Sequence, residues 1–269
     1  MDKVRSRPLR GMPYERFADI YGVWTATAPS ARANLAFYVE TYLATDGPVV
    51  ELGVGDGRIA VDAARRGRTM IGVDLSPAML RLCRERAARA GVLERLTLLE
   101  ADFRSFTLPE PAALIALPYH SLGHLLSLDD KRDALHHIQT QLRPGGAFVF
   151  DDFFMTPDHI DRMRRVQLRA EYQSADGHDV LLWVTSLVDQ AAQSMRVVTW
   201  EDQLDADGTQ ERRRYRTLSL TWLEVAQARS LLEDAGFTIE ACFGDFDRTP
   251  FHPSSAQEQI WIARKGASR

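Results

Sequence analysis

The positions of apolar residues in the first half of the chain predict alternating helices and strands. Between residues 30 and 43, apolar side chains recur at spacings of three and four, which is typical of a helix with one buried face. Asp46-Gly47-Pro48 ends this helix, and Val49-Val50-Glu51-Leu52 predicts a short buried strand. A glycine-rich turn and a helix from Arg58 to Arg66 follow, so this region predicts a strand, loop and helix unit.

The same alternation continues to residue 151. Ser76-Pro77 is a favourable helix start, with serine as the N-cap and proline at the first helical position. Pro144-Gly145-Gly146 is expected to stop a later helix over 129–142. The further strands expected are 69–73, 96–100, 112–117 and 147–150. This pattern predicts a Rossmann-like, doubly wound parallel sheet, whose ligands bind at the carboxyl ends of the strands.

The pattern changes after residue 166. Four strand-like segments follow, and Asp176-Gly177 and Asp207-Gly208 fall where hairpin turns are needed. A helix over 222–235 and two strands complete the chain. The expected strands are 166–173, 180–188, 194–204, 212–220, 237–243 and 257–263. We therefore predict an α/β fold, in which residues 1–152 and 222–269 form a seven-stranded, mostly parallel core and residues 153–221 form an inserted antiparallel β lid.

Composition and charge exclude several classes of protein. Of the 269 residues, 33 are basic and 37 acidic, and the net charge of −4 argues against a nucleic-acid partner. No apolar run approaches the ~18 residues that a membrane span needs. Cys83 and Cys242 stand alone, which suits a reducing cytoplasm. A homodimer is compatible with the sequence.

Three features fall at the carboxyl ends of the expected strands. The turn Gly53-Val54-Gly55-Asp56-Gly57 joins a strand to a helix, where backbone N–H groups are free to bind a ligand. Asp74 ends the second strand, where an acid can accept both hydroxyls of a ribose. Asp102 can accept from an adenine amino group, while Phe103 or Met79 covers a ring face. Together these residues predict a pocket for an adenosine.

In combination, the segments E-L-G-V-G-D-G-R, I-G-V-D-L-S-P-A-M-L, L-E-A-D-F and L-R-P-G-G-A-F-V-F-D-D resemble class I S-adenosylmethionine-dependent methyltransferases. The resemblance implies S-adenosylmethionine as cofactor. It implies that Glu51 and the loop with Gly53, Gly55 and Gly57 hold the methionine portion. It also implies that Asp74 holds the ribose. The adenine would be flanked by Leu75 and Met79, with Leu117 at the end of the fourth strand completing the cofactor site. The alternative is that Asp74 and Asp102 only cap the helix or turn that follows each of them.

The stretch after the fourth strand bears on the methyl acceptor. Ser121 to Leu125 is similar to the S-x-G-H-L stretch of small-molecule N-methyltransferases, including those acting on deoxyamino sugars. His120 and His124 are expected to act as a base or to accept a hydrogen bond from the acceptor, with helix packing as the alternative for His124. Tyr14 and Tyr21 resemble N-terminal tyrosines that cover the cofactor in this family, the alternative being an aromatic contact on the sheet.

Two further clusters are weaker candidates. Arg213, Tyr215, Arg216 and Arg248 are candidates for binding an anionic acceptor if they face the pocket, although strand alternation places Arg213 and Arg216 on opposite faces. Asp151-Asp152 ends the fifth strand, where some relatives hold a metal. No matching set of acids is present in the sequence, so loop hydrogen bonds are the preferred interpretation and no metal is expected.

These observations predict a methyltransferase that moves a methyl group from S-adenosylmethionine to a nitrogen, or less favourably an oxygen, of a small-molecule acceptor. An NAD(P)-dependent oxidoreductase is the first alternative. Arg58 opposes it, because a dinucleotide fingerprint needs glycine or alanine at this position. A non-catalytic S-adenosylmethionine-binding regulator is the second alternative.

Overall fold

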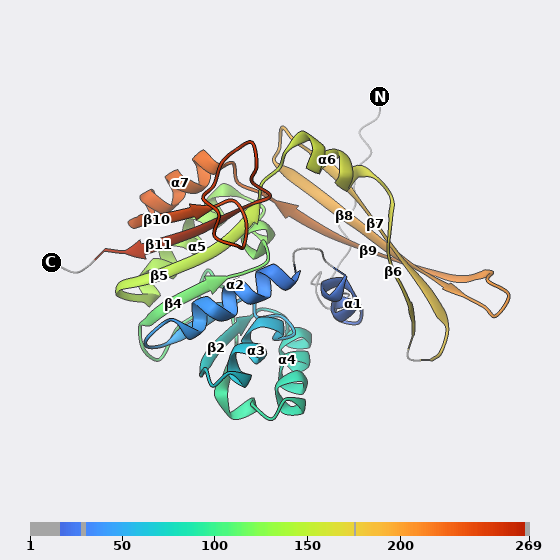
Figure 1. The fold of residues 1–269 in the computed structure, drawn as a ribbon, viewed down its shortest axis with the longest axis horizontal. Coiled ribbons are helices and arrows are strands. Elements are labelled where there is room, and N and C mark those ends of the chain that lie inside the picture. Colours follow the sequence, from blue (N-terminus) through green and yellow to red (C-terminus); the bar gives the residue numbers. More distant parts are fainter. Residues whose placement is uncertain (1–16, 28–30, 175, 267–269) are drawn as a thin grey trace.

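The computed structural model describes residues 17–27, 31–174 and 176–266, and contains two sheets (Figure 1). The larger sheet has seven strands in the order β10-β11-β5-β4-β1-β2-β3. Strands β1 to β5 pair in parallel, while β11 pairs antiparallel with both β5 and β10. The strands are β1 (Val49–Leu52), β2 (Met70–Asp74), β3 (Leu96–Glu100), β4 (Ala112–Leu117), β5 (Leu142–Phe153), β10 (Phe237–Phe243) and β11 (Glu258–Lys265). The predicted fold class is confirmed.

Helices cover both faces of this sheet. Successive side chains of a strand point to opposite faces, so Val49 belongs to one buried cluster and Val50 to the other. The first cluster includes side chains of α2, α3 and α4, and the second includes side chains of α5 and α7. These helices are α2 (Ala31–Leu43), α3 (Arg58–Arg65), α4 (Pro77–Arg89), α5 (Leu128–Gln141) and α7 (Val225–Asp234). None of the described helices is both long and apolar enough to cross a membrane.

Local signals fix several boundaries of these elements. The hydroxyl of Ser76 accepts a hydrogen bond from Met79 N at 3.3 Å, and Pro77 is the first residue of α4, as predicted. One boundary was predicted wrongly. Pro144-Gly145-Gly146 lies inside β5 rather than between helix and strand, because β5 already pairs with β4 at Leu142. The register then shifts so that the turn bulges out of the ladder.

The smaller sheet is the predicted insertion. It is antiparallel, with the strands β6 (Gln167–Gln173), β7 (Asp179–Asp189), β8 (Ser194–Leu204) and β9 (Gln210–Thr221) in that order. We call these four strands the lid sheet. It extends away from the core, with α1 (Tyr21–Ala26) close to β6 and α6 (Pro157–Arg164) close to β7 (Figure 1). The sequence did not reveal α6, because Ile160 is its single buried side chain and leaves no apolar periodicity.

Candidate active site

The glycine loop joins β1 to α3 at the carboxyl edge of the sheet. Gly53, Gly55 and Gly57 all have positive φ angles, of 64°, 57° and 77°, which other residues rarely adopt. A Cβ at Gly57 would lie 2.5 Å from the sulfur of Cys83, so α4 also packs too closely there for a side chain. The loop leads directly into the N-terminus of α3, where the helix dipole favours an anionic ligand group.

Asp74 holds this loop in place. Its Oδ2 accepts a hydrogen bond from Gly55 N at 2.8 Å, and its Oδ1 accepts one from Ser76 N at 2.8 Å. The hydrogen bond from Ser76 N shows that Asp74 also caps the turn that follows it, which was the alternative role expected for this residue. Each carboxylate oxygen has a second lone pair, so these bonds leave acceptor capacity for ribose hydroxyls. Next to Asp74, Leu75 is 46% exposed and Met79 is buried.

Glu51 is a buried carboxyl whose Oε2 lacks a hydrogen-bond partner among the described residues. Burial raises the pKa of Glu51 to about 8, because a charged carboxylate is costly away from water. A cationic ligand group would satisfy this oxygen. The ammonium of the methionine portion of S-adenosylmethionine is such a group, so the donor and acceptor set fits the expected cofactor.

The far end of the expected cofactor site contains Asp102, Phe103 and Leu117. Both oxygens of Asp102 accept hydrogen bonds from the guanidinium of Arg104, which lowers the pKa of Asp102. An adenine amino group would have to share this carboxylate. Phe103 packs against the buried cluster that contains Leu117. A Cβ at Gly53 would lie 4.0 Å from Leu117, so that residue adjoins the glycine loop.

Arg58 explains why the loop departs from the dinucleotide fingerprint. Its guanidinium donates to the carbonyl of Ala31 at 2.8 Å and to Asn34 Oδ1 at 2.6 Å, and it lies 5.5 Å from the centre of the Tyr119 ring. The side chain thus fastens α2 to the glycine loop, at a position where dinucleotide-binding proteins need a small residue for close helix packing.

A strained loop after β4 presents the first candidate histidine. Tyr119 and His120 have φ angles of 62° and 56°, a left-handed conformation that costs free energy for residues with side chains. The buried carboxylate of Asp151 compensates by accepting hydrogen bonds from Tyr119 N at 2.9 Å and His120 N at 3.0 Å, and from Tyr38 Oη at 2.6 Å. Asp151 thus makes the loop hydrogen bonds that were expected of it.

His120 is paired with an acid that the sequence did not single out. Its Nε2 lies 2.8 Å from Glu258 Oε2, and its ring stacks on Phe153 with centroids 3.8 Å apart. Burial alone would lower the pKa of His120, but Glu258 and Asp151 outweigh it and raise the pKa to about 9. His120 is therefore protonated at neutral pH. No sequence signal linked it to Glu258, because the two residues are 138 positions apart.

His124 lies at the end of a short 3-10 helix, η3 (Ser121–His124), close to β9. Burial, followed by the charges of Lys131 and His120, lowers the pKa of His124 to about 4. Its imidazole is therefore neutral at pH 7. The two histidines predicted from one sequence stretch thus have opposite protonation states.

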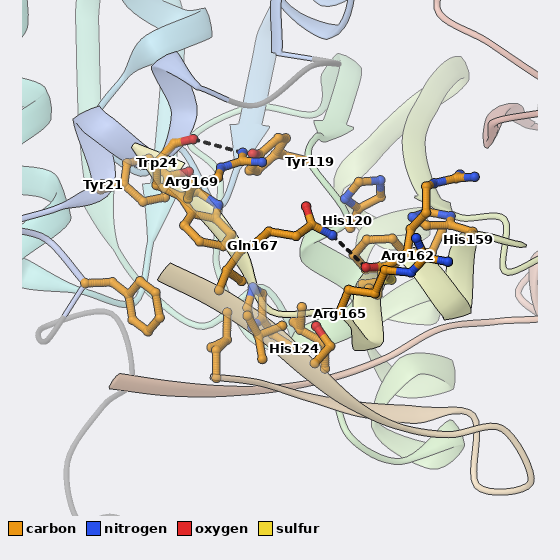
Figure 2. A pocket seen from close by; sticks show the side chains of 18 of the residues that line it. Tyr21, Trp24, Tyr119, His120, His124, His159, Arg162, Arg165, Gln167 and Arg169 are labelled. Atoms are coloured by element: carbon orange, nitrogen blue, oxygen red, sulfur yellow. Dashed lines mark hydrogen bonds between the residues drawn. The ribbon is translucent and has the colours of Figure 1, made fainter. Parts of the chain in front are cut away.

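A cavity of about 430 Å³ lies between the core and the lid sheet (Figure 2). His120 and His124 line it from the core side, together with Tyr21, which starts α1. A Cβ at Gly55 would lie 3.5 Å from the Tyr21 hydroxyl, so this tyrosine connects the cavity with the glycine loop. Tyr14 lies outside the described residues. Further lining comes from Phe17, Trp24, Tyr119, Phe153, His159, Arg162, Met163, Arg165, Gln167, Arg169, Val184, Ser186, Val197, Leu218, Leu220 and Glu258.

The cationic residues expected at this cavity are elsewhere. Arg213 is paired with Asp202, and Arg216 is buried against Glu201 and Asp19. The remaining two candidates, Tyr215 and Arg248, are also not among the described lining residues: Tyr215 lies beside Trp200, and Arg248 lies over Phe37. The alternation of side chains on β9 was predicted correctly, but β9 lines the cavity through Leu218 and Leu220 rather than through its arginines. Three other arginines, Arg162, Arg165 and Arg169, line it instead.

The His120–Glu258 pair predicts a pH dependence of stability. A histidine whose pKa rises from 6.5 to about 9 on folding stabilises the protein fully below pH 6.5, and this stabilisation is lost as the pH rises through 9. We expect Glu258→Gln to remove roughly 1–3 kcal/mol of unfolding free energy at pH 7 and to flatten its decline between pH 7 and 9.5. Urea unfolding at several pH values measures both effects.

The control for this experiment is Glu240→Gln. Glu240 pairs with Arg264 and is 47% exposed, so its loss should change stability little and leave the pH slope as in the wild type. Equal slopes in the wild type and Glu258→Gln would contradict the assigned charge of His120.

Comparisons with known proteins agree with this arrangement. Residues 49–146 match the family model of a methyltransferase domain. The putative methyltransferase YqeM of Bacillus subtilis is 23% identical over 260 residues, which cover 93% of this chain and 96% of that protein. The CcbJ methyltransferase from Streptomyces caelestis has a TM-score of 0.76 at 24% identity, covering 93% of this chain and 96% of that one. The sugar N-methyltransferase KedS8 from Streptoalloteichus sp. has a TM-score of 0.69 at 18% identity, covering 99% of both.

The solved structures share the fold, and the family model spans the strands that carry the glycine loop, Glu51 and Asp74. The comparisons thus agree with the cofactor chemistry that these residues fit. The chain is a class I S-adenosylmethionine-dependent methyltransferase.

Proposed function

We propose that this enzyme methylates a nitrogen atom of a small molecule bound in the cavity between the core and the lid sheet. The observation that carries the proposal is the position of this cavity, which meets the glycine loop at Tyr21. S-adenosylmethionine supplies a methyl group that an amine can take in line, forming the C–N bond as the C–S bond breaks with its electron pair left on sulfur. Residues 1–152 and 222–269 form the proposed cofactor-binding core, and 153–221 the proposed acceptor lid.

The proposed cofactor contacts follow the geometry of the loop. Glu51 binds the ammonium, the loop with Gly53, Gly55 and Gly57 encloses the rest of the methionine portion, and Asp74 binds the ribose. Leu75, Met79, Phe103 and Leu117 enclose the adenine, while Asp102 shares its carboxylate between Arg104 and the adenine amino group. Tyr21 separates the cofactor from the acceptor, and orientation of this kind supplies ~7–11 kcal/mol of a two-reactant barrier.

The charge states of the two histidines favour nitrogen over oxygen as the acceptor. A neutral amine attacks without a base, whereas a hydroxyl must lose its proton as it reacts. His120 already carries its proton at neutral pH, and the low pKa of His124 makes it a weak base. His124 is better suited to accept a hydrogen bond from an acceptor N–H, holding the nitrogen lone pair toward the methyl group.

The cavity size supports a small-molecule acceptor. Its volume of about 430 Å³ falls in the range of roughly 300–1,000 Å³ that is usual for small-ligand sites. The similarity to KedS8, which is a sugar N-methyltransferase, supports the same acceptor class. A nucleic-acid acceptor is disfavoured by the net charge of −4, and two free cysteines suit a cytoplasmic enzyme.

Replacing His124 with alanine tests the acceptor role. We expect methyl transfer from labelled S-adenosylmethionine to a panel of amines to fall at least tenfold, because a group that orients the acceptor is lost. The affinity for S-adenosylhomocysteine should stay within about twofold. Single-turnover transfer and calorimetry measure these two quantities separately.

His136→Ala provides the matched control, because His136 is exposed on α5. It should leave transfer and cofactor affinity unchanged. Unchanged transfer in His124→Ala would show that the acceptor binds elsewhere. Absence of transfer to any amine or alcohol, in a protein that binds S-adenosylhomocysteine, would favour the non-catalytic alternative.

A further inference from the structure

The cavity carries an unbalanced positive charge. Arg162, Arg165 and Arg169 line it, and none of the three forms an ion pair with a described residue. Glu258 is the single acid among the described lining residues, and it is paired with His120. Within the described part of the chain, no carboxylate pairs with these three guanidinium groups, although the net charge of the chain is −4.

Three other arginines of the lid sheet have carboxylate partners. On β9, Arg213 pairs with Asp202, Arg214 with Asp19, and Arg216 with Asp19 and Glu201. Placing a guanidinium in a partly buried site without an anion costs solvation free energy. The fold thus supplies carboxylates to these three cations of β9, whereas the described residues supply none to the arginines at the cavity.

Arg169 is the most confined of the three. Its Nε is buried and has no hydrogen-bond partner among the described residues. One terminal nitrogen donates to the carbonyl of Trp24 at 3.3 Å, and the guanidinium lies 4.9 Å from the centre of the Trp24 ring. These contacts fix the plane of the guanidinium but leave most of its donors unused, since arginine carries five N–H groups.

A β-bulge places Arg169 at the cavity. Leu168 pairs with Trp183 and Ala170 pairs with Leu182, which leaves Arg169 as the extra residue of β6. A bulge of this kind re-aims a side chain beside an active site. In Figure 2, Arg169 lies near Trp24 and Tyr119, whereas Arg162 and Arg165 lie near His159. Arg162 and Arg165 are exposed, so solvent screens their charge more than that of Arg169.

We propose that the methyl acceptor carries an anionic group, a carboxylate or a phosphate, that binds the guanidinium of Arg169 at the end of the cavity beside α1. Arg162 and Arg165 attract the same group at longer range as it enters. This inference rests on the proposed function, since it names the substrate class of the same cavity. Carboxylate and phosphate share the planar or near-planar oxygen pairs that a guanidinium binds through two N–H groups.

The cationic surroundings also act on the acceptor nitrogen. Nearby guanidinium groups disfavour a second cation, so they favour the neutral form of an amine over the ammonium. The neutral form is the one with a lone pair available for methyl transfer. An anionic group on the same molecule offsets this repulsion and draws the acceptor into the cavity in its reactive state.

The test is an anion titration that does not depend on methyl transfer. The Nε–H resonances of arginine are followed by ¹H–¹⁵N NMR at constant ionic strength while inorganic phosphate, acetate or neutral acetamide is added. The variants are Arg169→Gln, Arg169→Lys and, as the control, Arg212→Gln, which removes an exposed charge of β9 outside the described cavity lining. S-adenosylhomocysteine affinity is measured on the same samples.

We expect phosphate or acetate to shift the Arg169 resonance saturably and acetamide to leave it unchanged. Arg169→Gln should weaken anion binding at least tenfold, Arg169→Lys should weaken it less, and Arg212→Gln should leave it within about twofold. Saturation by acetate alone identifies a carboxylate acceptor, and by phosphate alone a phosphate ester. Saturation by both supports an anion site that accepts either.

The proposal is overturned if neither anion saturates, if acetamide gives the same shift, or if Arg212→Gln weakens binding as much as Arg169→Gln. If Arg169→Gln does not fold, the anion affinity of Arg169→Lys, which keeps the charge, is compared with that of the wild type instead. If the protein binds S-adenosylhomocysteine but no anion, this inference is overturned and the proposed methyltransferase function still stands. If the wild type does not bind S-adenosylhomocysteine, the cofactor site itself is contradicted.

Discussion

Replacing Asp151 with alanine is expected to lower the unfolding free energy by about 3–5 kcal/mol. The carboxylate accepts from Tyr38 Oη and from the backbone N–H groups of Tyr119 and His120, all at 3.0 Å or less. Its removal leaves buried donors unsatisfied and releases two residues held in a left-handed conformation. In a chain of this size the melting temperature should fall by roughly 6–20 °C, which calorimetry measures directly.

Asp151→Asn is the matched variant. The amide has the same shape and keeps one acceptor oxygen, but it places an NH₂ group where the carboxylate had its second acceptor. We therefore expect a loss of unfolding free energy between those of the wild type and Asp151→Ala. Because the same loop carries His120 and leads to His124, both variants should also reduce methyl transfer. A loss below ~1 kcal/mol in Asp151→Ala would mean that water replaces the carboxylate and that the loop does not depend on it.

Asp74→Ala is expected to weaken binding of S-adenosylhomocysteine well over tenfold while changing stability much less. The variant loses the proposed acceptor for the ribose hydroxyls and the hydrogen bond that holds Gly55 N at 2.8 Å. Loss of this hydrogen bond also displaces the loop that faces the methionine portion, so both effects weaken binding of the same ligand. Isothermal titration calorimetry measures the affinity, and urea unfolding separates it from stability.

Glu100→Ala serves as the control, because Glu100 is exposed at the equivalent end of the neighbouring strand β3 and pairs in register with Asp74. It should bind S-adenosylhomocysteine like the wild type. An unchanged affinity in Asp74→Ala would contradict the ribose role and leave Asp74 as a cap for the turn at Ser76.

The sequence alone determined the order of the strands and the edge of the larger sheet at which chemistry occurs. Hydrophobic periodicity and turn residues are local properties, so β1, β3 and β4 have the predicted bounds, and the four strands of the lid sheet were also recognised. The glycine loop and Asp74 could be predicted as neighbours because parallel strands end at one edge. The boundary at Pro144-Gly145-Gly146 failed, because pairing with β4 overrode a local stop signal.

Only the tertiary structure decided which polar groups meet. Glu258 reaches His120 across 138 positions, Asp151 reaches Tyr38 across 113, and a bulge brings Arg169 to Trp24 across 145. Arg213 and Arg216 of β9 do not form an anion site, because carboxylates already pair with both. Protonation state and free binding capacity depend on such partners and on burial, which arise when distant segments pack together, whereas strand and helix formation depends mainly on neighbours in the chain.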